Sequence, residues 1–209
     1  MANATLSHCK FIHIPKCGGT AMQTALWYIE CIKDKSQSFT TPQHGHLFAS
    51  QMPNDGKPCF TFVRNPVTWW QSFYYWNMNL QHSRFSEPEM QTKSFDHWLN
   101  DYGEFWLGLY SRLVYRYTGS DNKFKVPACN VILPEHVGKT ENLYNDLKVT
   151  FDLLGQPYNK DKMDALIAGK VTFLPEHANV QSYNRSAISP ASIDLIRATE
   201  KHVIEKYGY

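Results

Sequence analysis

Short apolar segments alternate along this chain with segments whose apolar residues recur at helical spacing. Residues 9–14 and 59–63 read as buried strands, and residues 130–133 read as a third. A helix is expected after each of the first two strands, and apolar residues spaced by three or four predict further helices over 142–154 and 191–206. This alternation is typical of an α/β fold with a mostly parallel central sheet.

The starts of the first two helices carry residues suited to capping. Thr20 followed by Gln23 fits a capping box at the first helix. Asn65 suits the N-cap of the second helix, and Pro66 suits its first position, where the missing N–H would have no partner in the helix. Both helices are therefore expected to begin directly after the turn that ends a strand.

Length and composition indicate one globular domain over residues 1–209. The chain of 209 residues can bury a core without disulfides, and a hydrophobic content of 43% argues against disorder. The formal net charge is +2 and there is no dense run of Lys and Arg, which argues against a nucleic-acid-binding protein. Any anion site must therefore be local and built by a few positioned groups.

The sequence also gives expectations about compartment. No apolar stretch approaches the roughly 20 residues of a membrane span, and residues 1–10 have no apolar signal-peptide core. The cysteines form no C-x-x-C pair, which disfavours a zinc ribbon and favours reduced thiols. There are five of them: Cys9, Cys17, Cys31, Cys59 and Cys129. We expect a cytoplasmic protein without a membrane span.

The turn between the first strand and the first helix contains residues suited to binding an anion. Residues 15–20 read Pro-Lys-Cys-Gly-Gly-Thr. Gly18 and Gly19 let the backbone approach an anion, and the helix start presents N–H groups and a partial positive charge. Lys16 adds a full positive charge and Thr20 adds a hydroxyl. The segment predicts a phosphate or sulfate site, and the alternative is an ordinary Gly-rich turn with an incidental Lys.

This loop differs from the loop of nucleotide triphosphatases. That loop has the pattern G-x-x-x-x-G-K-[ST], in which the Lys follows the glycines. Here Lys16 precedes them and the first glycine is missing. No clear magnesium-holding Asp follows the second strand, so an ATP-dependent small-molecule kinase is disfavoured.

A second cationic position follows the second strand. Arg64 stands at the carboxyl end of that strand, where open α/β sheets bind ligands. Its guanidinium can hold a phosphate through two parallel hydrogen bonds. Ser72 lies eight residues on, a little over two helical turns, and so shares a helix face with Asn65. The alternative is an Arg paired with an acid and a Ser facing solvent.

Together the two segments resemble the PAPS-dependent sulfotransferases, where PAPS is 3′-phosphoadenosine 5′-phosphosulfate. The family carries a loop of the type P-K-x-G-[GS]-[ST], here residues 15–20, and a later R-[DN]-P followed by a Ser, here Arg64 to Pro66 with Ser72. Residues 137–143, Val-Gly-Lys-Thr-Glu-Asn-Leu, resemble a segment that follows a later strand in Golgi-type carbohydrate sulfotransferases and their bacterial relatives. The closing run from residue 177 to 209 is similar to their C-terminal ends, whereas residues 75–127 show no such resemblance.

The resemblance implies a P-loop-like three-layer fold, with a central parallel sheet flanked by helices, that binds PAPS. Lys16 would face the transferring sulfuryl group, and Cys17, Gly18, Gly19 and Thr20 would hold the 5′-phosphosulfate. Arg64 and Ser72 would hold the 3′-phosphate of PAPS and of its product PAP, adenosine 3′,5′-bisphosphate. No metal is required, because Lys and helix N–H groups can stabilise the transferring charge.

Sulfuryl transfer to a hydroxyl needs a group that takes its proton. Residues 43–46, Gln-His-Gly-His, resemble the His-Gly-His stretch of uronyl 2-O-sulfotransferases, whose second His is the base. This favours His46 as the base, with His44 next, and an imidazole suits the role near neutral pH. Glu30 is a further alternative. The histidines could instead be surface residues or a metal pair, although no clear third ligand is near.

The acceptor is the least constrained part of the prediction. Aromatic residues crowd two segments, 69–76 and 98–110, and could stack on a sugar or a phenol. Aromatics at helical spacing more often form core. A hydroxyl acceptor, in particular a sugar, is expected only from the relatives that the chain resembles. The competing function is a nucleotide-binding module that keeps both anion sites and lacks transfer activity.

Overall fold

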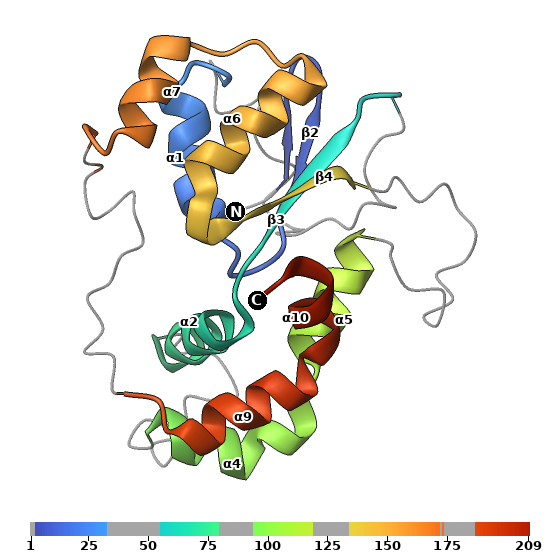
Figure 1. Cartoon of the computed structure of the whole chain (residues 1–209), viewed down its shortest axis with the longest axis vertical. Helices are drawn as coiled ribbons and strands as arrows, with labels where there is room; N and C mark the ends of the chain where they lie inside the picture. The colour runs from blue at the N-terminus through green and yellow to red at the C-terminus, as the bar shows by residue number, and fades with distance from the viewer. Residues whose placement is uncertain (1–2, 33–54, 80–93, 119–133, 172, 174–186) are drawn as a thin grey trace. The chain divides into compact units, whose positions relative to one another are not determined.

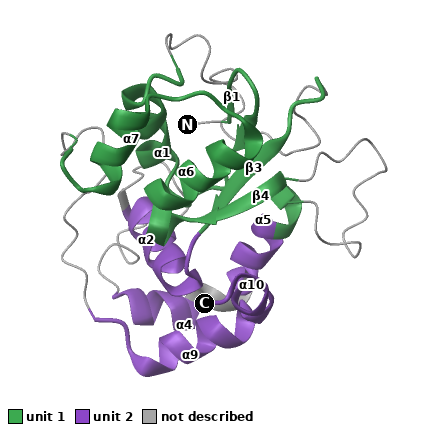
Figure 2. Cartoon of the chain, turned by 45° about the horizontal axis from the view of Figure 1, so that its top comes forward, with its two compact units in different colours: residues 1–63, 115–180 green, residues 64–114, 181–209 purple. Residues whose placement is uncertain are grey.

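The computed structural model describes most of the chain, and its residues group into two compact units (Figures 1 and 2). The described residues are 3–32, 55–79, 94–118, 134–171, 173 and 187–209. The first unit comprises Met1–Val63 and Tyr115–Val180, and the second comprises Arg64–Val114 and Gln181–Tyr209. In the described part the fold is α/β, with a four-stranded sheet and eight α-helices.

The sheet lies in the first unit and is mostly parallel. Its strands are β1 (Ala4–Thr5), β2 (Lys10–Ile12), β3 (Cys59–Val63) and β4 (Pro134–Lys139), in the order β1-β2-β3-β4. β1 is antiparallel to β2, whereas β2, β3 and β4 run parallel. The first two predicted strands are thereby confirmed. The third prediction, 130–133, lies outside the described residues, and β4 begins directly after it.

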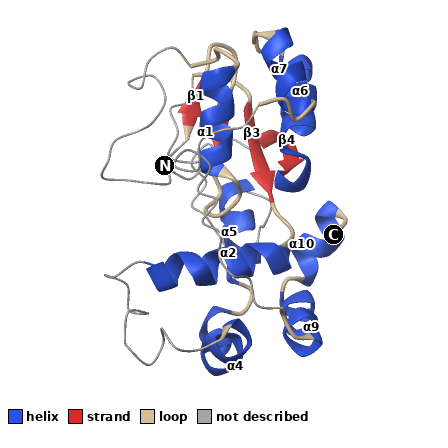
Figure 3. Cartoon of the chain, turned by 90° about the vertical axis from the view of Figure 1, so that its left-hand side faces the viewer, coloured by secondary structure: helices blue, strands red, loops and turns tan. Residues whose placement is uncertain are grey.

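Helices pack on one face of this sheet. They are α1 (Gly19–Tyr28), α6 (Leu143–Leu154) and α7 (Lys160–Ile167), with a short 3-10 helix η3 (Thr140–Asn142) before α6. Phe60 and Phe62 alternate along β3 and so share a face, which joins Phe11 of β2 and the apolar sides of these helices in one core. Figure 1 shows the three α-helices on the same side of the sheet, whose strands Figure 3 draws in red.

The second unit is helical, with an aromatic core. Its helices are α2 (Pro66–Asn79), α4 (Phe95–Trp106), most of α5 (Leu109–Thr118), α9 (Pro190–Thr199) and α10 (Lys201–Tyr207). Trp69, Trp70 and Trp98 are fully buried, and the ring of Trp69 stacks on Tyr110 with centroids 4.7 Å apart. These aromatics serve as core, whereas Trp76 is 43% exposed.

The helical structure predicted over 191–206 is confirmed except at Glu200, where a one-residue break separates α9 from α10. The Glu200 side chain is fully buried and accepts four hydrogen bonds. One oxygen accepts from Trp70 Nε1 (3.0 Å) and the N–H of Tyr110 (3.2 Å). The other accepts from the N–H of Ser111 (2.7 Å) and its hydroxyl (2.5 Å). The carboxylate therefore satisfies N–H groups in the first turn of α5, where a negative charge is favoured.

The described cysteines are free thiols, as expected for reduced cysteines; Cys129 lies outside the described residues. Cys9, Cys17 and Cys59 are buried, and Cys31 is half-buried. Burial raises the pKa of Cys9 and of Cys31 to about 12, and the pKa of Cys59 to about 11. These three thiols are therefore protonated at neutral pH and are poor nucleophiles.

Candidate anion-binding site

The loop of residues 15–20 joins β2 to the start of α1. Gly18 is the N-cap of α1, with φ 75° and ψ 19°, and Gly19 is its first residue. The capping box predicted at Thr20 is wrong: Thr20 is the second helical residue, and no side chain caps this end. The first-turn N–H groups have no acceptor within the helix, so this end suits an anion.

Both glycines are required by their surroundings. A Cβ on Gly19 would overlap the imidazole ring of His13, which is buried at the end of β2. A Cβ on Gly18 would lie 2.9 Å from Cγ2 of Thr140, and its positive φ also disfavours a side chain. The loop can therefore lie against β2 and the end of β4 only if positions 18 and 19 have no side chain.

Lys16 has an uncommon backbone conformation. Its φ is 66°, in the left-handed region that costs a non-glycine residue about 1–2 kcal/mol. Its side chain is half-exposed. Strained residues of this kind cluster at functional sites, because only a functional constraint or a rigid surrounding maintains them.

Arg64 follows the last residue of β3 and precedes α2. Asn65 is the N-cap, as predicted: its side-chain oxygen accepts from the N–H of Val67 at 2.9 Å, and α2 begins at Pro66. Arg64 Nε donates to Thr68 Oγ1 at 3.0 Å, which directs the guanidinium along the first turn of α2. The hydroxyl of Tyr110 accepts from the N–H of Arg64 (2.6 Å) and donates to its carbonyl (2.8 Å).

Ser72 lies one turn after Thr68 on the same side of α2, and its side chain is half-buried. Thr68 and Ser72 therefore follow one another along α2, and Arg64 just before the helix bonds to Thr68. Sequence reasoning missed Thr68, although its position four residues from both Arg64 and Ser72 is the spacing of helical neighbours. The loop belongs to the first unit, and Arg64 and Ser72 belong to the second.

Thr140, directly after β4, is the second residue that sequence reasoning missed as a site residue. Its hydroxyl donates to the carbonyl of Val63 at 2.9 Å, and its methyl group faces Gly18. Its neighbour Lys139 pairs with Val63 in the sheet and donates its N–H to Asp146 at 2.7 Å. Residues 137–143 therefore span the end of β4, η3 and the first residue of α6, with Thr140 beside Gly18 of the loop.

Of the three candidate bases, the structure describes Glu30 alone. His44 and His46 lie outside the described residues. Glu30 lies past the end of α1, where its carboxylate contacts Lys162 Nζ at 2.7 Å and Asn159 at 3.4 Å. The ten residues of α1, about 15 Å of helix, separate it from the loop. Glu30 is therefore the weaker alternative.

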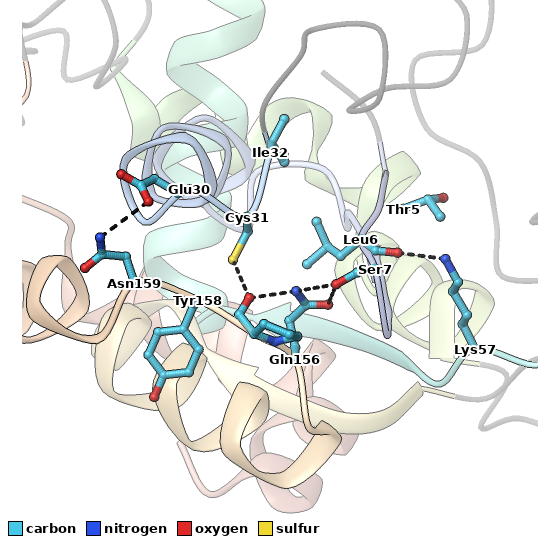
Figure 4. Close-up of a pocket in the computed structure, with 11 residues that line it drawn as sticks. Thr5, Leu6, Ser7, Glu30, Cys31, Ile32, Lys57, Gln156, Tyr158 and Asn159 are labelled. Carbon is cyan, nitrogen blue, oxygen red and sulfur yellow. Dashed lines mark hydrogen bonds between the residues drawn. The ribbon is translucent and has the colours of Figure 1, made fainter.

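A cavity of about 780 Å³ lies at the same end of α1 as Glu30 (Figure 4). Its side chains bond mainly to nearby groups of the chain: Gln156 Nε2 donates to Ser7 Oγ at 3.0 Å, and Lys57 Nζ donates to the carbonyl of Leu6 at 2.8 Å. Cys31 donates to a backbone carbonyl at 3.4 Å. Because it lies at the far end of α1, this cavity is not part of the loop site.

The described residues contain no group of three or more His, Cys, Asp or Glu side chains arranged to hold a metal ion. None of their helices combines the length and apolar character that a membrane span requires.

Comparison with known proteins gives no assignment. No protein-family model matches the chain, and no curated protein sequence matches it either.

Proposed function

We propose that this chain is a PAPS-dependent O-sulfotransferase with a P-loop-like three-layer fold. The observation that carries the proposal is the loop before α1. Gly18 and Gly19 open a helix start to an anion, and Lys16 is held beside them in a strained conformation. The loop follows the carboxyl end of a parallel strand, where α/β folds bind nucleotides.

In this proposal the two cationic segments bind the two anionic ends of PAPS. Residues 16–20 hold the 5′-phosphosulfate. Arg64, directed along α2 by Thr68, holds the 3′-phosphate together with Ser72. Its planar guanidinium suits phosphate, and its placement before a helix start adds a favourable partial charge.

The transfer is an in-line displacement. The acceptor hydroxyl oxygen, in a sugar by preference, forms a bond to sulfur while the bond from sulfur to the bridging oxygen of PAPS breaks, and PAP leaves. Lys16 stabilises the charge that develops on that bridging oxygen. The hydroxyl proton passes to an imidazole, His46 by preference and His44 otherwise.

The nucleotide proposal predicts selective stabilisation by PAP. A ligand at about 100 times its Kd stabilises the folded state by about 2.7 kcal/mol, which raises Tm by about 5–10 °C in a chain of this size. We expect this shift with PAP, a weak shift with ADP, and its loss in Arg64→Ala. The exposed Arg197→Ala is the matched control and should keep the shift. An equal shift with ATP would instead favour a kinase-like protein, and no shift with PAP would refute the proposal.

The base assignment predicts a separation of binding from transfer. In His46→Ala the transfer of sulfate from PAPS to a panel of sugar and phenol acceptors should be abolished, because no group takes the hydroxyl proton. PAP binding should be unchanged. The exposed His202→Ala serves as control. Full transfer by His46→Ala would move the role to His44, and PAP binding by the wild type without any transfer would favour a binding module.

A further inference from the structure

Thr140 contacts two different chain segments, one through its hydroxyl and the other through its methyl group. Its hydroxyl donates to the carbonyl of Val63, the last residue of β3, at 2.9 Å. Its methyl carbon lies where a side chain on Gly18 would come within 2.9 Å. One β-branched side chain, fixed at its χ1 angle, therefore touches both the end of β3 and the phosphate loop.

The bond to Val63 acts on the residue that follows it. The carbonyl of Val63 and the N–H of Arg64 belong to one planar peptide group. Thr140 holds the carbonyl, and the hydroxyl of Tyr110 accepts from the N–H at 2.6 Å. This peptide plane is therefore fixed, which sets the direction of the Arg64 backbone as it leaves β3. At the other end of the side chain, Arg64 Nε is held by Thr68 at 3.0 Å.

We propose that Thr140 is a positioning residue whose hydroxyl sets the placement of Arg64 and thereby the preference for nucleotides that carry a 3′-phosphate. Its methyl group has a separate role, which is to support Gly18 and hence the site of the 5′-group. This inference rests on the proposed function, since it assigns the 3′-phosphate to Arg64.

Two substitutions separate the role of the Thr140 hydroxyl from that of its methyl group. Thr140→Val keeps the methyl group and the shape but removes the hydroxyl. Thr140→Ser keeps the hydroxyl but removes the methyl group. PAP and AMP are the probes, because they share the 5′-phosphate and differ in the 3′-phosphate. Calorimetric titration of the full chain gives Kd for both, and circular dichroism verifies folding.

We expect the ratio of Kd(AMP) to Kd(PAP) to fall about tenfold in Thr140→Val. Without the hydroxyl, Arg64 is no longer held in place and loses its charge-assisted hydrogen bond to the 3′-phosphate of PAP. In Thr140→Ser both Kd values should rise by similar factors, so that the ratio stays within about twofold.

A variant that is merely less stable would change the Kd values of both ligands by the same factor. An unchanged ratio in Thr140→Val, or a fall of the ratio in Thr140→Ser, would overturn the role of Thr140 while leaving the PAP site intact. A wild type that does not prefer PAP would refute the proposed function itself. If Thr140→Val does not fold, the ratio in Thr140→Ser decides.

Discussion

Replacing Gly19 by alanine should lower the free energy of unfolding by about 3 kcal/mol and abolish the proposed binding of PAP. The added methyl group would overlap the ring of His13, which is only 6% exposed and cannot swing freely into solvent. The start of α1 would have to move away from β2, and its N–H groups would move with it. Urea unfolding followed by tryptophan fluorescence, and a PAP thermal shift, measure the two effects.

The cause can be tested by removing the other partner of the overlap. His13→Ala/Gly19→Ala should recover most of the stability that Gly19→Ala loses, because the methyl group then occupies space left by the ring. Neighbouring substitutions that share one contact are not additive, and the double-mutant cycle measures that difference. An additive cycle would show that the loss at position 19 has another origin.

Glu200→Ala is expected to destabilise the chain by about 3–5 kcal/mol, a large part of the 5–15 kcal/mol typical of a folded domain. The substitution leaves Trp70 Nε1 and the N–H groups of Tyr110 and Ser111 buried without their carboxylate acceptor. Each buried donor left without an acceptor costs about 1–3 kcal/mol. The midpoint and slope of urea unfolding give the change.

Glu205→Ala provides the control for this substitution. Glu205 lies in α10, only five residues from Glu200, and is exposed in an ion pair with Lys201. Its loss should change stability by less than about 0.5 kcal/mol. Equal free energies of unfolding for the Glu200→Ala and Glu205→Ala variants would contradict the structural role assigned to the buried carboxylate.

Much of the local structure could be predicted from the sequence, because it depends on neighbours in the chain. The apolar run of β3 and the Asn65-Pro66 start of α2 are local patterns, and the structure confirms both. The break at Glu200 is not local. The apolar positions before and after it keep one periodicity, while the carboxylate turns inward to donors about 90 residues away in α5.

The candidate site shows the same division. The loop glycines and Arg64 could be predicted as site residues because their residue types and spacing are visible in the sequence. Thr140 and Tyr110 act through hydrogen bonds to residues 77 and 46 positions away, which no sequence window contains. The capping error at Thr20 has a nearer cause, since Gly18 takes the N-cap position in a conformation that leaves no side chain to cap the helix.

The order of the sheet has a consequence for how the protein folds. The parallel strands are distant in sequence: Thr61 of β3 bonds to Ile12 of β2 across 49 residues, and Thr140 bonds to Val63 across 77. Such high contact order slows folding, because the entropy of closing long loops is lost before the strands make contact. The α-helices can begin to form early, but the support of the loop by Thr140 exists only after β4 has joined the sheet. A nascent chain that ends before β4 therefore lacks this support for the candidate anion site, and the proposed nucleotide binding should be among the last properties that the folding chain acquires.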